Sequence, residues 1–124
     1  MSFWFIGDEE CDDPRFHQAG AGACGLYFMA GSQCMRGVYK RDLPAEWFVP
    51  DHWVRRWPNG ARAAGRLVQV GLWERADGGY YYKWIRPQNT PDALRATREM
   101  ERKKKDRART AARRASFTVI PGAS

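Results

Sequence analysis

The sequence of 124 residues lacks the features that mark membrane-spanning and secreted proteins. No apolar run approaches the roughly 18 residues that a membrane-spanning helix needs. The first ten residues contain no basic segment, so we expect no signal peptide. Three cysteines are an odd number for a secreted disulfide framework. The cytoplasm, as a reducing compartment, is therefore the expected location.

Motifs for catalysis, nucleotide cofactors and metals are also missing. The sequence contains no P-loop, no G-x-G-x-x-G and no C-x-x-C. No combination of acid, base and nucleophile emerges, so we expect no enzyme, no cofactor and no small-molecule substrate. The candidate soft metal ligands are Cys11, His17, Cys24, Cys34 and His52. Their spacing in the sequence matches no known pattern of zinc ligands. We therefore expect no metal site, and we interpret Cys24 and Cys34 as small core residues.

Charge and aromatic residues divide the chain into two parts. All but one of the 17 Phe, Trp and Tyr residues lie within the first 84 positions, where we expect the core. Residues 1–85 hold ten Lys/Arg and ten Asp/Glu, whereas residues 86–124 hold eleven and four. The excess charge of +7 therefore lies on the C-terminal third, as in proteins that bind a polyanion. Five acids lie at positions 8–13, and the sequence leaves three interpretations of them open. They form a solvated loop, bind a divalent cation, or pair with this basic segment within one chain or between chains.

Local signals predict the elements of an α+β head. We expect a short strand over 3–6 and a helix from Pro14 to Ala19, begun by Asp13 and Pro14. The small residues at 19–25 form either a loop or the start of a buried helix that continues to about Cys34. Residues 37–48 look like a connection.

The second half of the head has stronger signals. A helix over 50–56 and another over 60–70 flank the turn Pro58-Asn59-Gly60, and Asn59 is a candidate cap of the second helix. Gly71 ends that helix, and Asp77-Gly78-Gly79 marks a hairpin between aromatic runs. We expect a domain over 1–86, a linker over 87–89, a basic helix over 90–116 and a tail over 117–124.

Helix, tight turn, helix and hairpin is the element order of a winged helix-turn-helix. In the second helix, the predicted inner face consists of Ala61, Ala64, Leu67 and Val68. The predicted outer face is small and basic, with Arg62, Ala63, Arg66 and Gln69 facing the major groove. Further candidate DNA contacts are Arg55, Arg56, Asn59 and Lys83. The alternative is an ordinary α+β core with arginines facing solvent.

Several segments carry a resemblance to a known family: WFIGDEE, DDPRF, GLYFMAGS, FVPDHWVRRW and ARAAGRLVQVGLWERADGGYYYKW. Together these resemble small winged-helix proteins of actinobacterial phages and prophages, related to replication-initiation (replisome organiser) N-terminal domains. The resemblance implies that residues 60–70 are the recognition helix, that residues 76–80 are the wing tip, and that the protein works in the bacterial host cytoplasm.

The C-terminal helix supplies the remaining candidate contacts, which are Arg95, Arg98, Arg102, Lys103, Lys104, Lys105, Arg107, Arg109, Arg113 and Arg114. Its only large apolar residues are Leu94 and Met100, too few for a coiled coil or a membrane-surface helix. We therefore expect double-stranded DNA, or another nucleic acid, as the partner, in replication initiation or replisome assembly. The alternatives are a transcriptional regulator, or a module that binds replication proteins, host proteins or a second copy through its acidic start or basic tail.

Overall fold

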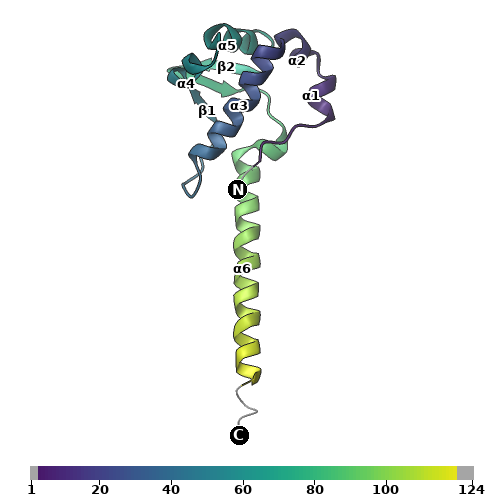
Figure 1. Cartoon of the computed structure of the whole chain (residues 1–124), viewed down its shortest axis with the longest axis vertical. Coiled ribbons are helices and arrows are strands. Elements are labelled where there is room, and N and C mark those ends of the chain that lie inside the picture. The colour runs from purple at the N-terminus through teal and green to yellow at the C-terminus, as the bar shows by residue number, and fades with distance from the viewer. Residues whose placement is uncertain (1–2, 120–124) are drawn as a thin grey trace.

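The computed structural model describes residues 3–119, with side chains over 3–116, and has a mostly helical α+β fold with a small antiparallel sheet. Its elements follow in the order α1 (Asp8–Asp12), α2 (Pro14–Ala19), α3 (Ala21–Gly37), β1 (Phe48–Pro50), α4 (Asp51–Arg56), α5 (Gly60–Gln69), β2 (Trp73–Ala76), β3 (Gly79–Tyr82), the 3₁₀ helix η1 (Pro87–Asn89) and α6 (Pro91–Val119). Elements α1 to η1 form a head, and α6 projects from it as one long helix (Figure 1). We call residues 3–90 the head.

A side chain, not a neighbouring strand, holds the N-terminal segment. Residues 3–7 form neither helix nor strand, so the predicted strand over 3–6 is wrong. The backbone N–H of Phe5 donates to Asn89 Oδ1 at 2.7 Å, and Asn89 Nδ2 donates to the Phe5 carbonyl at 2.8 Å. Because one buried amide satisfies both backbone groups, the segment needs no strand partner.

The helices at the start of the head begin as the local signals indicate. Asp13 Oδ1 accepts a hydrogen bond from the backbone N–H of Arg15 at 2.9 Å, which confirms the predicted start of α2. Of the two readings of residues 19–25, the helical one is right, because α3 begins at Ala21. A Cβ atom on Gly31 would lie 2.4 Å from the Trp4 ring. Gly31 therefore lets the N-terminal segment pack closely against α3.

The predicted hairpin is confirmed, with Gly78 in the turn at a φ of +79°. Strand β1 pairs with β3, so that the sheet has the order β1-β3-β2. The sequence did not predict β1, because three residues are too short to show a strand pattern. This short strand joins the chain that follows α3 to the hairpin.

The core lies between α3, α5 and the sheet. Its largest fully buried apolar side chains are those of Trp73, Tyr27, Leu26, Leu67, Leu72 and Val49. Around it, Trp4, Trp53 and Trp57 are half-buried and pack against the core. The hydroxyls of Tyr27 and Tyr82 donate to backbone carbonyls at 2.8 and 2.5 Å. Both tyrosine hydroxyls are thus satisfied, whereas the buried Trp73 Nε1 has no hydrogen-bond partner among the described residues.

The two helices predicted around the turn at 58–60 are present as α4 and α5, and Gly71 follows α5 with a φ of +85°. Two details of the prediction are wrong. The side chain of Asn59 caps no backbone amide, because the residue has the left-handed conformation, at a φ of +53°. Ala63 is buried and Ala61 is exposed, which reverses their predicted faces. The reason is that α5 packs against both α3 and α4, so its buried face includes Gly60, Ala63, Ala64 and Leu67 and leaves Ala61 outside.

Residues 87–89 belong to the head and are not a free linker. They form η1, in which Asn89 is 1% exposed. Trp47 Nε1 donates to the Asn89 carbonyl at 2.7 Å, a bond between residues far apart in the sequence. These contacts bury Asn89, whereas Pro87 and Gln88 are exposed, and the polar composition of the segment did not predict this attachment.

The start of the long helix is as predicted, because Thr90 Oγ1 accepts from the backbone N–H of Ala93 at 3.1 Å. Helix α6 continues to Val119, past its predicted end at residue 116. The rest of the predicted tail, residues 120–124, lies outside the described residues. Within residues 3–119, no helix combines the length and the apolar character needed to cross a membrane.

Candidate nucleic-acid interface

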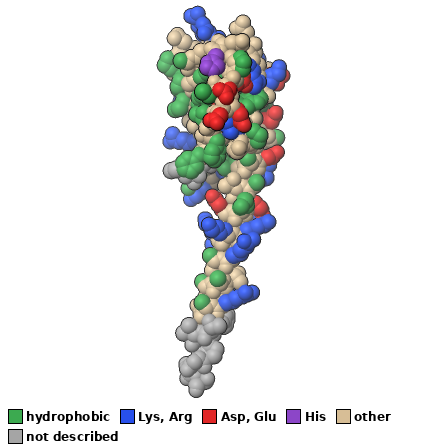
Figure 2. All heavy atoms as spheres, turned by 90° about the vertical axis from the view of Figure 1, so that its right-hand side faces the viewer, with side chains coloured by type: hydrophobic (Ala, Val, Ile, Leu, Met, Phe, Trp, Pro, Cys, Tyr) green, Lys and Arg blue, Asp and Glu red, His purple; other side chains and the backbone are tan. Residues whose placement is uncertain are grey.

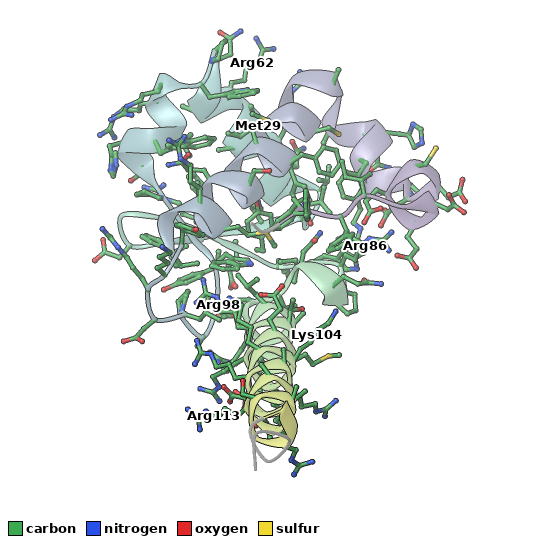
Figure 3. All side chains as sticks on the ribbon, turned by 60° about the horizontal axis from the view of Figure 1, so that its bottom comes forward. Met29, Arg62, Arg86, Arg98, Lys104 and Arg113 are labelled. Carbon is green, nitrogen blue, oxygen red and sulfur yellow. The ribbon has the colours of Figure 1, made fainter. Side chains whose placement is uncertain are left out.

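The exposed face of α5 carries two arginines and a glutamine. Arg62, Arg66 and Gln69 are exposed, together with Ala61 and Gly65 between them. These positions share one face because three or four residues make one helical turn. Arg62 lies at the outer edge of the head in Figure 3. Arg66 keeps one long hydrogen bond, from its Nη1 to the Ala19 carbonyl at 3.5 Å. Neither arginine of this face pairs with a carboxylate of the described residues, so both guanidinium groups can donate to a partner.

Small residues flank this face on the side of the α2–α3 junction. A recess of about 310 Å³ lies between Arg62 and Arg66 of α5 and residues 19–23. A second recess borders Arg66 and Gln69 and is also lined by Gln18 and Val70. Gly20, Ala21 and Gly22 place no large side chain beside the arginines. The face is thus open to a partner that approaches α5 from outside.

The other predicted contacts of the head fall in different places. Arg55 and Arg56 are exposed at the end of α4, and Asn59 is exposed in the turn before α5. Ala63 is buried, which corrects its predicted place on the exposed face of the helix. Lys83 is exposed but follows β3, so it lies at the open end of the hairpin, away from the turn at Gly78. A contact through the hairpin turn would not involve Lys83.

An ion pair that the sequence did not reveal ties the hairpin to α4. Both guanidinium nitrogens Nη1 and Nη2 of Arg75 donate to the carboxylate of Asp51. The guanidinium lies 4.7 Å from the centre of the Tyr80 ring. The backbone N–H of Asp51 also donates to the Gly78 carbonyl at 3.0 Å. Arg75 lowers the pKa of Asp51 by hydrogen bonding to its carboxylate. Asp51 and Arg75 are 24 positions apart in the sequence, so no local pattern could have predicted this pair.

Three of the predicted DNA-contacting arginines on α6 make bonds within the protein. Arg98 donates from Nη1 to the Arg41 carbonyl and from Nη2 to the Val38 carbonyl, both at 2.8 Å. It therefore joins α6 to the loop after α3, and a phosphate contact, which stays a prediction, would have to replace these two bonds. Arg95 pairs with Asp92, and Arg102 pairs with Glu99, both within α6.

Beyond Arg98, α6 leaves the head. We call residues 99–116 the basic rod, and all of them are exposed. The rod contains eight Lys/Arg and three Asp/Glu. Within the described part of the chain, six of its cations make no ion pair, and they are Lys103, Lys104, Lys105, Arg107, Arg109 and Arg113. Arg114 is exposed on the same helix. The protein's own carboxylates therefore leave most of the rod's charge available.

Three of the five acids at positions 8–13 form ion pairs inside the head, and within the described residues none of the five pairs with the rod. Glu10 is 5% exposed and accepts two hydrogen bonds from Arg86, each at 2.8 Å. Glu9 also pairs with Arg86, and Asp13 pairs with Arg15. Hydrogen bonds from Arg86 lower the pKa of Glu10. Figure 2 shows this acidic side of the head above the rod, whose surface carries Lys and Arg side chains.

The described residues contain no group of three or more His, Cys, Asp and Glu placed to hold a metal ion. The Cys34 thiol donates to the Phe48 carbonyl, and burial raises its pKa to about 12. The Cys24 thiol donates to the Phe16 carbonyl, and burial also raises its pKa. Both cysteines pack against the core, so their thiols are not activated as nucleophiles.

The two basic surfaces lie at opposite ends of the molecule. In Figure 1, α5 lies at the top of the head and α6 leaves its underside. In Figure 3, Arg62 and Arg113 mark these two extremes, with Arg98 at the junction between them. Scans against family models, curated proteins and solved structures found no match to this chain.

Proposed function

We propose that the protein binds duplex DNA through the exposed face of α5, as a winged-helix protein would. The observation that carries this proposal is the open face of Arg62, Arg66 and Gln69, with no carboxylate engaged. The element order supports it, because a helix, a short strand, a helix-turn-helix and a hairpin follow one another from α3 to β3. The sheet order β1-β3-β2 fits the same arrangement.

The chemistry of this face suits the major groove. Arg can donate two hydrogen bonds to guanine O6 and N7 or bind a phosphate, and Gln can pair with adenine. Ala61 and Gly65, which lie on the same face, leave room for base edges to approach the helix backbone. Arg55 and Arg56 supply charge for flanking phosphates. The hairpin turn, Asp77-Gly78, carries no cation, so α5 and not the wing provides the main contact.

The resemblance to phage winged-helix proteins favours replication initiation or replisome assembly as the biological role. A transcriptional regulator would use the same face. Footprinting on the DNA of the source genome separates the two roles, because protection of an origin supports the first and protection of a promoter supports the second.

The test is duplex binding, measured by fluorescence anisotropy over a series of salt concentrations. We expect Arg62→Gln/Arg66→Gln to weaken binding by at least about tenfold, since each lost bidentate contact costs about 1–3 kcal/mol. The log–log salt slope should also fall in magnitude by about 2. The control is Arg36→Gln/Arg41→Gln, which removes the same charge from exposed positions at and after the end of α3. Equal affinity of the α5 variant and the control would end this proposal.

A further inference from the structure

The position of the basic rod relative to α5 raises a question that the proposed function leaves open. The rod carries most of the uncompensated positive charge of the described chain, yet it points away from the face that we assign to DNA (Figures 1 and 3). A rod that clamped the duplex bound at α5 would have to lie beside α5. Its charge must therefore serve a different partner or a different segment of DNA.

The direction of the rod is set by contacts at its base. Arg98 holds α6 to two carbonyls of the loop after α3, and Leu94 packs against the core. Thr90 caps the first turn, and Pro91 is buried. A helix of 29 residues extends for about 43 Å. These contacts keep the far end of α6 well away from the head.

Duplex DNA is too stiff to join the two ends of the molecule by bending. Its persistence length is about 50 nm, so a short segment in contact with α5 continues nearly straight past the head. It cannot turn back to reach a rod on the opposite side.

The surface of the rod fits phosphates better than it fits a protein. Arg102, Lys105, Arg109 and Arg113 recur at helical spacing along one side, and Lys103 and Arg107 lie on another. The only large apolar side chain of the rod's described residues is Met100, which is 72% exposed. A protein interface usually has an apolar centre, which this surface lacks. Cations around a helix can instead grip a phosphate backbone by charge alone.

We infer that one molecule bridges two separate duplex segments, one on α5 and one on the basic rod. The inference rests on the proposed function of α5 and adds a second DNA site of a different kind. The α5 site would read base edges, whereas the rod would bind phosphates of any sequence. Such a molecule would hold together two DNA molecules, or two distant segments of one.

The test is a capture assay with full-length protein. One duplex is fixed to beads, a fluorescent duplex is added, and the retained fluorescence is measured as protein concentration rises. Bridging predicts capture that rises and then falls, because excess protein occupies each duplex separately. Binding of single duplexes is measured in parallel by anisotropy.

Two variants separate the ends of the molecule. The rod variant carries Gln at Lys103, Lys104, Lys105, Arg107 and Arg109, which are exposed and touch no part of the head. We expect it to retain binding of one duplex and to lose capture by at least about fivefold. Its matched control replaces the three lysines by arginine, which keeps the charge and should keep the capture. Arg62→Gln/Arg66→Gln should also lose capture, and mixing the two variants should not restore it.

The outcomes are distinguishable. If Arg62→Gln/Arg66→Gln, introduced into the rod variant, binds single duplexes as tightly as the rod variant alone, the proposed function fails. If that variant binds weakly but the wild type captures no second duplex, only the bridging inference fails. Capture by the rod variant equal to that of the wild type would also overturn it. A third outcome would overturn it as well. If the wild type sediments as a dimer in the absence of DNA and the rod variant sediments as a monomer, the rod binds a second copy of the chain.

Discussion

Glu10 is the most constrained charged residue of the head. Its carboxylate accepts two hydrogen bonds from Arg86 and one from the backbone N–H of Gly7, at 2.6 Å. A Cβ atom on Gly7 would lie 2.3 Å from the Arg86 guanidinium, so a larger residue at position 7 would displace the guanidinium from this pair. The pair joins α1 to the segment that enters η1, and it stabilises the N-terminal half of the head through charged, buried hydrogen bonds.

Replacing Glu10 should change how stability depends on pH. Arg86 lowers the pKa of Glu10 below its ordinary value of 4.5, so the folded state favours the carboxylate. The stabilisation is complete above the ordinary pKa and is lost as pH falls through the lowered one. We expect Glu10→Gln to cost about 2 kcal/mol at neutral pH. This difference should shrink below pH 4.5, as measured by urea unfolding over a pH series.

The control for this experiment is Glu9→Gln. Glu9 pairs with the same arginine, but its side chain is 67% exposed, so a smaller loss of stability is expected. Parallel pH profiles for the wild type and Glu10→Gln would contradict the assigned role of Glu10.

At the scale of elements, the turn between α4 and α5 decides whether the arginine face forms. The N–H of Gly60 donates to the Trp57 carbonyl at 2.8 Å, which starts α5 close against α4. A Cβ atom on Gly60 would lie 1.8 Å from the Val54 carbonyl oxygen. Backbone atoms cannot yield as a flexible side chain can, so any larger residue would push the two helices apart.

Two glycines of α5 provide a matched comparison. Gly60→Ala should destabilise the head by on the order of 2 kcal/mol through overpacking and should weaken DNA binding. Gly65 is exposed in the same helix, and a Cβ there would meet no atom within 4 Å. Gly65→Ala should therefore stabilise the protein by about 0.5–1 kcal/mol. Thermal and urea unfolding measure both effects, and a neutral Gly60→Ala would show that the turn tolerates a side chain.

At the scale of the whole molecule, one arginine connects the head to the rod. Arg98 extends from α6 to the carbonyls of Val38 and Arg41, where the chain turns after α3. Lys40 adopts a φ of +58° in this loop, so the loop is sharply turned where the guanidinium meets it. Arg98 is thus a predicted phosphate contact on α6 that, within the described residues, hydrogen-bonds to the head.

Loss of this connection should release the base of α6. We expect Arg98→Ala to increase amide hydrogen exchange over residues 38–41 and the first turns of α6. Arg95→Ala is the matched control, because Arg95 is one turn earlier in α6 and pairs only with Asp92. Exchange that is unchanged in Arg98→Ala, or equally raised in both variants, would contradict the role of Arg98.

Much of the local structure was predictable from the sequence because its causes are local. The cap of α2 by Asp13, the hairpin turn at Gly78, the end of α5 at Gly71 and the start of α6 at Thr90 each depend on residues close together in the chain. The separation of the neutral aromatic part from the basic part was also visible, since it follows from composition. The arginines of α5 were identified as exposed from helical spacing alone.

Only the tertiary structure decided which of these features meet. Asn89 replaces a strand partner for Phe5, Arg75 pairs with Asp51, and Arg98 holds the loop after α3, all across long separations in sequence. Ala63 is buried because of the way α5 packs against its neighbouring helices. The spacing of apolar residues within α5 does not predict this packing. The opposite placement of α5 and the rod follows from the same packing (Figure 1). Side-chain type and spacing determine local conformation, but relative position depends on contacts between distant residues, which form only when the chain folds.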